Sequence, residues 1–566
     1  MRLDGEKATF IVLLVVVGFL TIIPLAFVVF SSFWSVSPGV AGHLTFLNYL
    51  EAYSNPLTYH AILNTFVYSL GATSEAAAIG IPFSWFVSRT NTPFARFLEY
   101  VSIIPYMIPG ILYAIAWVFL LNPNNGAILL PIAHAFGLRN IPFSIYSLGG
   151  MIFVDGLTGV PLIVIFLSAA FKNQDSTLED SAAIIGSGKF QILRSITLPL
   201  VLPAILAAIS LNILRYFELF EVPAVIGLPG GVYVLSTLIY GQISGIIPNF
   251  GYATVLGITA IMVSLLLVYV YRRSTMRANR FATITGKGRR LDKIDLGRWK
   301  YFSFAFCLIV FLVSTVLPTT SLILGAILPY WGILSTESLT KALSQASLNH
   351  FYFAFSLGIV RRAFVNSFIV SILGATIGMV LALFIGHILA KSNIRGKSVL
   401  EQLSFAPFAI PGIVMGLGLL SAYTFLPIPV IGTIWVLLLA YLTKFMPYGI
   451  RSMTSNLVQV HKELEESSRV AGSSWIGTIR KVIVPLVRSG FVGGWILLFI
   501  IFMREVSSSI LLYRYGSEVL SVVVYALLTD IQWEAASAIG VVMVAIILIA
   551  SFIAYRVAES ETVGVA

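Results

Sequence analysis

The chain has 566 residues, of which 58% are hydrophobic and only 10% are charged, and its formal net charge is +11. A soluble domain carries about 25% charged residues, so this composition excludes a soluble globular protein and predicts an all-α, polytopic protein embedded in lipid. Its single cysteine, Cys307, lies in an apolar run, which excludes an intramolecular disulfide and a cysteine-ligated metal site.

Apolar segments of about 20 residues, long enough to cross a bilayer as a helix, recur twelve times along the chain. The first six are expected near residues 9–30, 62–88, 97–121, 147–171, 199–220 and 250–271. The second six are expected near residues 301–327, 363–390, 400–424, 430–456, 487–510 and 536–556. The first segment is longer than the apolar core of a signal peptide, so we expect it to be retained as a membrane helix.

The distribution of basic residues predicts the orientation of these spans. Ten of the 35 lysines and arginines lie between Arg272 and Lys300, whereas the loops 31–60 and 222–249 have none. Because basic residues accumulate on the cytoplasmic side, both termini and the connection after the sixth span are predicted to be cytoplasmic. This placement in loops also argues against a nucleic acid as partner. Arg361 and Arg362 precede the eighth span on the outer side and do not fit the rule.

The sequence contains an internal repeat. Residues 64–112 align without a gap with residues 366–414, and Pro109-Gly110 in the third span matches Pro411-Gly412 in the ninth. We therefore divide the chain into a first transmembrane repeat (1–271), a basic cytoplasmic linker (272–300) and a second transmembrane repeat (301–566). Because each repeat has an even number of spans, the repeats run parallel and are suited to line one central pathway.

Two predicted cytoplasmic loops, one in each repeat, carry the same pattern. An acidic pair precedes a glycine, and a proline follows the glycine by 13 residues. Acidic residues are favoured where a helix begins, glycine permits the left-handed turn that ends it, and proline is tolerated where the next helix starts. Each loop is therefore predicted to form a helix–turn–helix docking element. Its residues are Glu179, Asp180, Ala182, Gly186 and Pro199 in the first loop, and Glu465, Glu466, Gly472 and Pro485 in the second.

These loops resemble the EAA loops of ABC importer permeases, in which E-A-A-x-x-x-G is followed by a distant L-P. Asp180 stands at the position of the glutamate in the first copy, and Ser181 and Ser467 stand at that of the first alanine. The resemblance implies a type I permease fold and loops that dock into grooves of cytoplasmic ATPase subunits. The implied partners are two copies of an ABC ATPase subunit and an extracytoplasmic substrate-binding protein. With both halves on one chain and Pro-x-x-x-Pro-Gly in the third span, the sequence is similar to ferric-iron and thiamine importer permeases, whose relatives handle polyamines or phosphonates.

Charged residues inside predicted spans are costly and are therefore candidates to line a pathway. They are Glu75, Asp155, Arg215, Glu218, Glu221, Lys444, Arg504 and Glu505. The same side chains could instead hold helices together as buried ion pairs. His350, His387 and His461 are scattered in the sequence, so we expect no metal site.

The segment Gly186-Ser187-Gly188-Lys189 resembles the end of a phosphate-binding loop, but Ala183 and Phe190 break that pattern. We therefore expect a chain that is not itself an enzyme, binds no ATP and needs no cofactor. The leading interpretation is the permease of an ATP-driven, binding-protein-dependent importer in the inner membrane. The alternatives are an ion-coupled secondary transporter, with Glu75 and Asp155 as relay residues, and a structural membrane protein without transport. The duplicated docking loop favours the importer.

Overall fold

The computed structural model describes residues 5–137, 143–174, 177–278, 293–426 and 428–563. Within these ranges the chain is helical, and its only extended pairings are two isolated bridges, Trp34–Leu44 and Thr90–Ile294. The chain folds as two compact units that interleave in sequence. Unit 1 comprises Met1–Thr58, Leu238–Ile261 and Asn349–Ala566, and unit 2 comprises Tyr59–Thr237 and Met262–Leu348.

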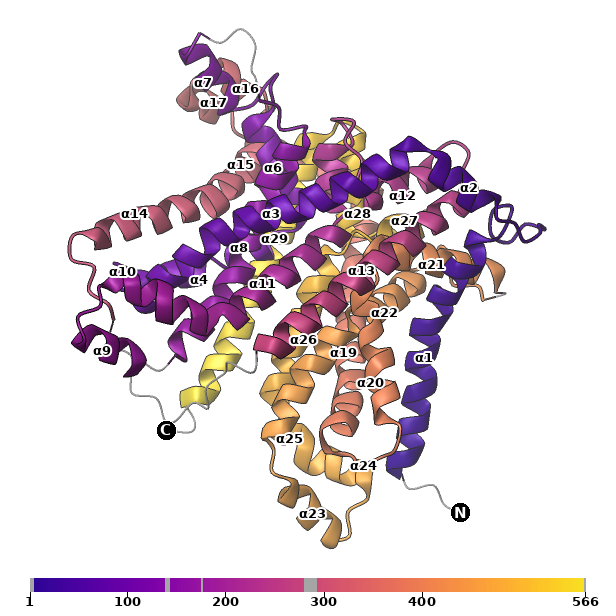
Figure 1. Cartoon of the computed structure of the whole chain (residues 1–566). Helices are drawn as coiled ribbons and strands as arrows, with labels where there is room; N and C mark the ends of the chain where they lie inside the picture. The colour runs from indigo at the N-terminus through magenta and orange to yellow at the C-terminus, as the bar shows by residue number, and fades with distance from the viewer. Residues whose placement is uncertain (1–4, 138–142, 175–176, 279–292, 427, 564–566) are drawn as a thin grey trace. The chain divides into compact units, whose positions relative to one another are not determined.

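Unit 1 is built around the long helix α19, which packs along α22 and α26, while α26 packs against α29 (Figure 1). The helices of this unit are α1 (Gly5–Ser32), α2 (Leu47–Ser54), α18 (Asn349–Ser356), α19 (Gly358–Lys391), α20 (Lys397–Phe405), α21 (Gly412–Phe425), α22 (Ile434–Gln459), α23 (Lys462–Val470), α24 (Trp475–Thr478), α25 (Val484–Leu486), α26 (Arg488–Arg504), α27 (Ser509–Leu512), α28 (Leu520–Thr529) and α29 (Trp533–Val563).

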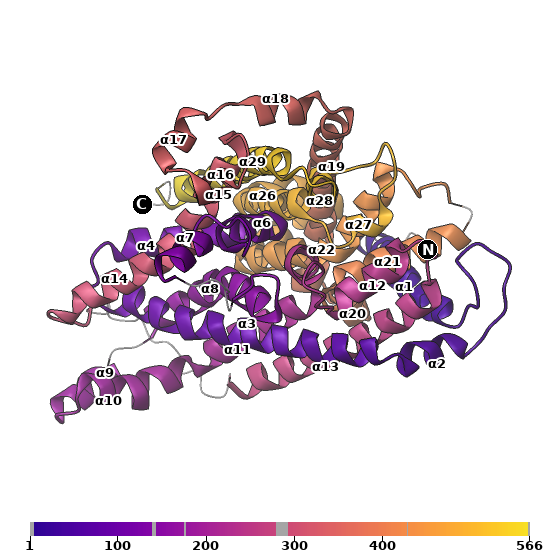
Figure 2. The ribbon, with the colours of Figure 1, turned by 90° about the horizontal axis from the view of Figure 1, so that it is seen from above.

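In unit 2 the helices α3, α8 and α11 run side by side, as both views show (Figure 2). The helices of this unit are α3 (Pro56–Arg89), α4 (Ala95–Val101), α5 (Ile104–Met107), α6 (Gly110–Leu121), α7 (Leu129–Ala135), α8 (Leu148–Lys172), α9 (Thr177–Ile184), α10 (Lys189–Ile192), α11 (Leu198–Glu218), α14 (Trp299–Phe311), α15 (Leu317–Ile327), α16 (Ile333–Thr336) and α17 (Leu339–Ser344). The residues of α12 (Leu235–Ser244) and α13 (Phe250–Ala278) are divided between the two units, and the first three residues of α3 are assigned to unit 1. Cys307 is buried in an apolar cluster with Phe83 and Val160.

The first span of each repeat packs with helices of the other repeat. Helix α1 lies in unit 1 against α20 and α21, where the Thr21 hydroxyl donates to the carbonyl oxygen of Leu403 at 3.2 Å. Helices α14 and α15 lie in unit 2 against α4 and α6, where the Tyr113 hydroxyl donates to the carbonyl oxygen of Ser314 at 2.8 Å. The compact units therefore do not follow the sequence repeats 1–271 and 301–566, which remain a prediction. Residues 279–292 of the predicted linker lie outside the described residues.

Each of the twelve expected spans coincides with a helix or a pair of helices. Seven described helices are long and apolar enough to cross a membrane, and the number rises to ten if each of three bent pairs is one span. The two remaining expected spans, 62–88 and 430–456, fall on α3 and α22. These helices are more polar than the others, because α3 carries Glu75 and α22 carries Lys444 and Arg451.

The third span of each repeat is broken at the repeated Pro-Gly dipeptide. The segments on either side of Pro109 meet at 99°, and those on either side of Pro411 meet at 110°. The residues before these prolines, Ile108 and Ile410, are extended, because a proline ring disfavours helical backbone at the preceding residue. A third bent pair, Trp475–Leu486 and Arg488–Arg504, meets at 80°.

The structure extends the repeat beyond the segment that sequence alignment finds. Helix α2 (Leu47–Ser54) and helix α18 (Asn349–Ser356) have equal length and lie at the same offset as residues 64 and 366. Each buries one alanine fully, Ala52 and Ala354, and each leads directly into the long second span of its repeat. The sequences of the two helices share only an alanine and a serine, so the alignment could not detect them.

Candidate functional site

The first predicted docking loop folds as expected from its pattern. Helix α9 is followed by Gly186, whose backbone is left-handed with φ +94°, and then by α10 and a π-helical turn, η1 (Leu193–Thr197). Helix α11 begins at Leu198, with Pro199 in its first turn. A Cβ atom added at Gly186 would meet no heavy atom within 4 Å, so the backbone conformation and not crowding requires glycine here.

The second docking loop repeats this arrangement. Helix α23 is followed by Gly472, with φ +86°, then by α24 and a π-helical turn, η6 (Ile479–Ile483). Pro485 lies in the short helix α25 that leads into α26. The space beside Gly472 is also open. The structure thus confirms the predicted conformation of both glycines, while the role of the loops in coupling stays a prediction.

In the first loop, the carboxylate of Glu179 points back toward the membrane helices. It is 7% exposed and forms an ion pair with Arg89, the last residue of α3, which is itself buried. The Thr197 hydroxyl also donates a hydrogen bond to Glu179, at 2.6 Å. Glu179 therefore joins the start of the docking loop to the end of the second span and to the start of α11.

In the second loop, Glu465 occupies the position equivalent to Glu179. It is 4% exposed, and its Oε2 lies 3.1 Å from Nε2 of His387, which is buried near the end of α19. The imidazole also lies edge-on to Trp475 of α24, with ring centroids 5.6 Å apart. Lys391, at the repeat position of Arg89, donates instead to the carbonyl oxygen of Val460.

Burial and charge act in opposite directions on the Glu465 carboxyl. Burial raises its pKa, but the hydrogen bond from His387, the charge of that imidazole and the nearby cations Lys391 and Arg469 together lower the pKa below its usual value. Glu465 is therefore ionised at neutral pH, and it contributes to stability above its usual titration range. That contribution is lost when the pH falls through the lowered pKa.

In the second loop, the residue after the buried glutamate differs in environment from the glutamate itself. Glu466 is exposed and lies 3.7 Å from Lys462 one turn earlier. Exposed apolar side chains follow near the glycine: Ile184 is 86% exposed in the first loop, and the equivalent Val470 is 89% exposed in the second. The pattern predicts a docking role for both acids of each pair, but the second loop turns one acid inward and the next outward, because adjacent helical residues face different sides. The side chain of Asp180 lies outside the described part of the structure.

Sequence reasoning missed the partners of the buried glutamates. Arg89 and His387 are distant in sequence from the glutamates that they contact, whereas Thr197 lies only 18 residues from Glu179. The spacing of the histidines in the sequence does not single out His387. One signal was available: a cation ends the second span in both repeats, Arg89 in the first and Lys391 in the second.

Unit 2 gathers several of the predicted intramembrane charges into one hydrogen-bonded group. Asp155 of α8 is buried and accepts hydrogen bonds from the hydroxyls of Tyr68 and, at 3.1 Å, Thr158. Arg215 of α11 donates to the carbonyl oxygen and hydroxyl of Thr158, both at 3.3 Å, and its guanidinium lies 5.1 Å from the ring of Tyr106. These contacts join α3, α8 and α11 through hydrogen bonds to Tyr68 and Thr158. Whether the charges line a pathway or only hold helices together stays a prediction.

Two glutamates in unit 2 lie against glycines. A Cβ at Gly156 would stand 2.5 Å from the carboxyl carbon of Glu75, and one at Gly110 would stand 1.9 Å from an oxygen of Glu221. Gly110 is the first residue of α6, so Glu221 lies at a helix N-terminus, where a carboxylate is electrostatically favoured. Glu218 ends α11 and is half-buried.

In unit 1 the charged residues Lys444 and Glu505 lie on either side of the break in the third span. Lys444 of α22 donates to the carbonyl oxygen of Ile410, directly before the break at Pro411. Glu505 accepts from the backbone N–H and hydroxyl of Ser508, at 2.8 and 3.0 Å, and lies 3.6 Å from a Cβ placed at Gly412, where α21 begins. The cation thus lies at the carbonyl end of one segment and the anion near the amide end of the next. Arg504 ends α26.

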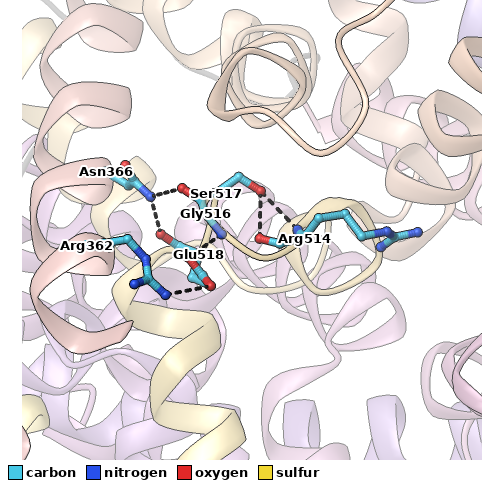
Figure 3. A network of polar contacts seen from close by, with 6 residues as sticks. All are labelled: Arg362, Asn366, Arg514, Gly516, Ser517 and Glu518. Carbon is cyan, nitrogen blue, oxygen red and sulfur yellow. Dashed lines mark hydrogen bonds and ion pairs between the residues drawn. The ribbon is translucent and has the colours of Figure 1, made fainter. Parts of the chain in front are cut away.

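The structure gives Arg362, left unexplained by the sequence, a place in a polar network (Figure 3). Its guanidinium lies 3.5 Å from Glu518 and 4.5 Å from the centre of the Tyr515 ring. Asn366, one turn further along α19, donates to the carbonyl oxygens of Gly516 and Glu518 at 3.0 and 2.9 Å. The pair therefore holds the turn before α28 against the start of α19, whereas Arg361 is exposed.

Comparison with known proteins assigns a family. Residues 80–279 and 374–562 match the family described as "Binding-protein-dependent transport system inner membrane component". The chain belongs to this family. It is therefore a multi-pass permease component, and the double match agrees with two copies of the same fold.

Individual relatives are distant but extend over most of the chain. The ferric transport system permease protein FbpB of Actinobacillus pleuropneumoniae is 24% identical over 480 residues, which cover 84% of this chain and 68% of the relative. The Fe(3+)-transport system permease protein FbpB 2 of Haemophilus influenzae is 22% identical and covers 88% of this chain and 89% of the relative. A putative 2-aminoethylphosphonate transport system permease protein, PhnV of Salmonella typhimurium, is 23% identical over 252 residues, 44% of this chain.

Proposed function

We propose that this chain is the complete translocation pathway of an ATP-driven importer and that its two docking loops receive separate ATPase subunits. The observation that carries the proposal is the duplication of the loop. In each repeat a short helix ends at a left-handed glycine, an exposed apolar residue stands just before that glycine, and a buried glutamate fixes the helix from behind. An exposed isoleucine or valine at such a place is suited to enter a groove on a partner.

The loops have the features that force transmission requires. When the ATPase subunits close on nucleotide, they would draw the two docking loops together. The loops would move the spans to which they are joined, and the pathway would open toward the binding protein. The general logic is alternating access by movement of one part of the membrane domain against another. Both termini and the linker 272–300 lie on the ATPase side in this proposal, because that side carries the basic residues.

The proposed cargo is ferric iron, delivered by an extracytoplasmic binding protein. The support comes from the names of the relatives that cover most of this chain, two of which are ferric transport permeases. Thiamine, polyamines and phosphonates are the other small solutes handled by fused or related permeases. The binding protein selects the cargo in such systems, so the permease itself needs no resident metal site or cofactor.

The proposal is tested by capture of the cognate ATPase subunit. The variants Gly186→Asp and Gly472→Asp place a charged side chain at a left-handed position with open space around it, at a strain cost of about 1–2 kcal/mol. We expect both variants to be inserted and folded but to lose ATPase capture and cargo uptake in vesicles. The double variant should lose both completely.

A matched control separates docking from backbone strain. Gly231 also has a positive φ, +69°, with open space beside it, but α11 separates it from the first docking loop. Gly231→Asp should therefore fold with similar strain and retain ATPase capture. Wild-type capture and uptake in the double docking-loop variant would refute the proposal, and uptake driven by an ion gradient without ATP would favour a secondary transporter.

A further inference from the structure

The two docking loops hold their buried glutamates in the same way but with different cations. Glu179 is paired with Arg89 and Glu465 with His387, and all four side chains are buried. Both cations lie in the last turn or two of the second span of their repeat, α3 in one case and α19 in the other. An ion pair at such a place joins the docking helix to one particular membrane helix.

Burial strengthens both ion pairs, which we call the joints between the docking helices and the second spans. Water screens an exposed ion pair, whereas a pair removed from water interacts strongly and is costly to separate, because each charge would remain desolvated without a partner. Thr197 adds a hydrogen bond to Glu179, and Trp475 packs against His387. A displacement of α9 is therefore transmitted directly to α3, and a displacement of α23 to α19, because separating the ion-paired side chains would cost free energy.

We propose that Arg89 and His387 are positioning residues that fix the docking helices α9 and α23 to the second spans, so that movement of each docking helix is transmitted to its repeat. This inference rests on the proposed function, because transmission has meaning only if an ATPase moves the loops. It goes beyond that function by naming the residues that carry the movement. Arg89 and His387 need not contact either the ATPase or the cargo.

Several elements surround the ion pair of the second repeat. His387, Lys391 and Arg469 together lower the pKa of Glu465, and Glu6 of α1 lies 3.9 Å from Arg469. Helix α24 contributes Trp475, and α22 contributes Thr454 and Leu457 beside the neighbouring Gly386.

Two substitutions at His387 separate charge from hydrogen bonding. A glutamine can offer Glu465 only a hydrogen bond, whereas an arginine supplies a guanidinium, as Arg89 does in the first repeat.

The test is the number of ATP molecules hydrolysed per cargo ion taken up, measured in proteoliposomes that contain the permease and its ATPase subunit, with loaded binding protein on the other side. We expect His387→Gln and Arg89→Gln each to raise this ratio by about fivefold, the lower end of typical coupling effects. His387→Arg should keep the low wild-type ratio, because a guanidinium again places a cation beside Glu465.

The controls separate the possible failures. The charge-reversed double variant Arg89→Glu, Glu179→Arg should restore part of the coupling that each single variant loses. A wild-type ratio in both His387→Gln and Arg89→Gln would overturn the inference, and so would variants that lower only the amount of folded complex. If the wild-type complex assembles but shows no ATP-driven uptake, the proposed function fails instead. Should His387→Gln not fold, the ratios of Arg89→Gln and of the charge-reversed double variant decide.

Discussion

The docking loops of unit 1 and unit 2 both keep a buried glutamate at the same position, but they pair it with different residue types. Both units place a buried glutamate at the start of the loop, but unit 2 pairs it with a terminal arginine and unit 1 with a histidine one turn earlier. In unit 1 Lys391, at the repeat position of Arg89, donates a hydrogen bond to a backbone carbonyl instead. Both repeats thus retain a contact between the docking loop and the end of the second span, but the residue that pairs with the glutamate lies at a different position.

The broken third spans differ in a similar way. A glutamate stands near the start of the second segment in both units, Glu221 at Gly110 and Glu505 at Gly412. Only unit 1 adds a lysine, Lys444, to the carbonyl before the break, whereas Thr158 stands at the corresponding repeat position in unit 2. The bend is common to both units because Pro-Gly causes it, and the polar groups around it vary.

The largest expected effect comes from removing the cation at the end of the second span. Arg89→Met leaves Glu179 buried without its ion-pair partner and should lower the free energy of unfolding by about 3–5 kcal/mol. Lys391→Met, at the matched position, removes a hydrogen bond to a carbonyl and a nearby charge but leaves Glu465 paired with His387, so it should cost less, about 1–3 kcal/mol. Thermal unfolding in detergent measures both. Equal losses would show that the two positions are equivalent after all.

A smaller effect is expected at the bend of unit 1. Lys444→Met leaves the Ile410 carbonyl oxygen without this donor, and we expect a loss of about 1–3 kcal/mol in the free energy of unfolding. Arg451→Met removes an exposed cation from the same helix and should change stability by no more than about 0.5 kcal/mol. The yield of folded protein and the uptake per folded molecule are measured together. Normal yield with lost uptake would instead assign Lys444 to the pathway.

The smallest effect is expected at the outer turns of the two units. Gly516 and Gly231 both have positive φ, +98° and +69°, and open space where a Cβ would stand. Gly516→Ala and Gly231→Ala should each cost about 1–2 kcal/mol, the strain of a left-handed alanine, and the asparagine variants should cost less. A much larger loss for Gly516→Ala alone would show that the network around Arg362 and Glu518 depends on this turn.

Patterns of residues close together in sequence predicted much of this structure. They did not predict contacts between residues that are far apart in sequence. The helix positions, the break at Pro-Gly and the left-handed glycines of the docking loops follow from residues close together in sequence. The partners of Glu179 and Glu465 could not be predicted, because Arg89 and His387 lie on helices that only the tertiary fold brings near. The packing of α1 and α14 against helices of the other repeat could not be predicted for the same reason, because the sequence of an apolar helix does not indicate which helices it contacts.

The exchange of the first helices has a consequence for biogenesis. Helix α1 leaves the ribosome long before the helices that it packs against, α20 and α21, because nearly 370 residues separate Ser32 from Lys397. Until then α1 must remain in the bilayer without its final neighbours. It has the highest mean hydropathy of the seven long apolar helices, which suits a segment that lipid alone must hold during synthesis. Assembly of unit 1 can therefore finish only after translation has passed the second copy of the Pro-Gly break.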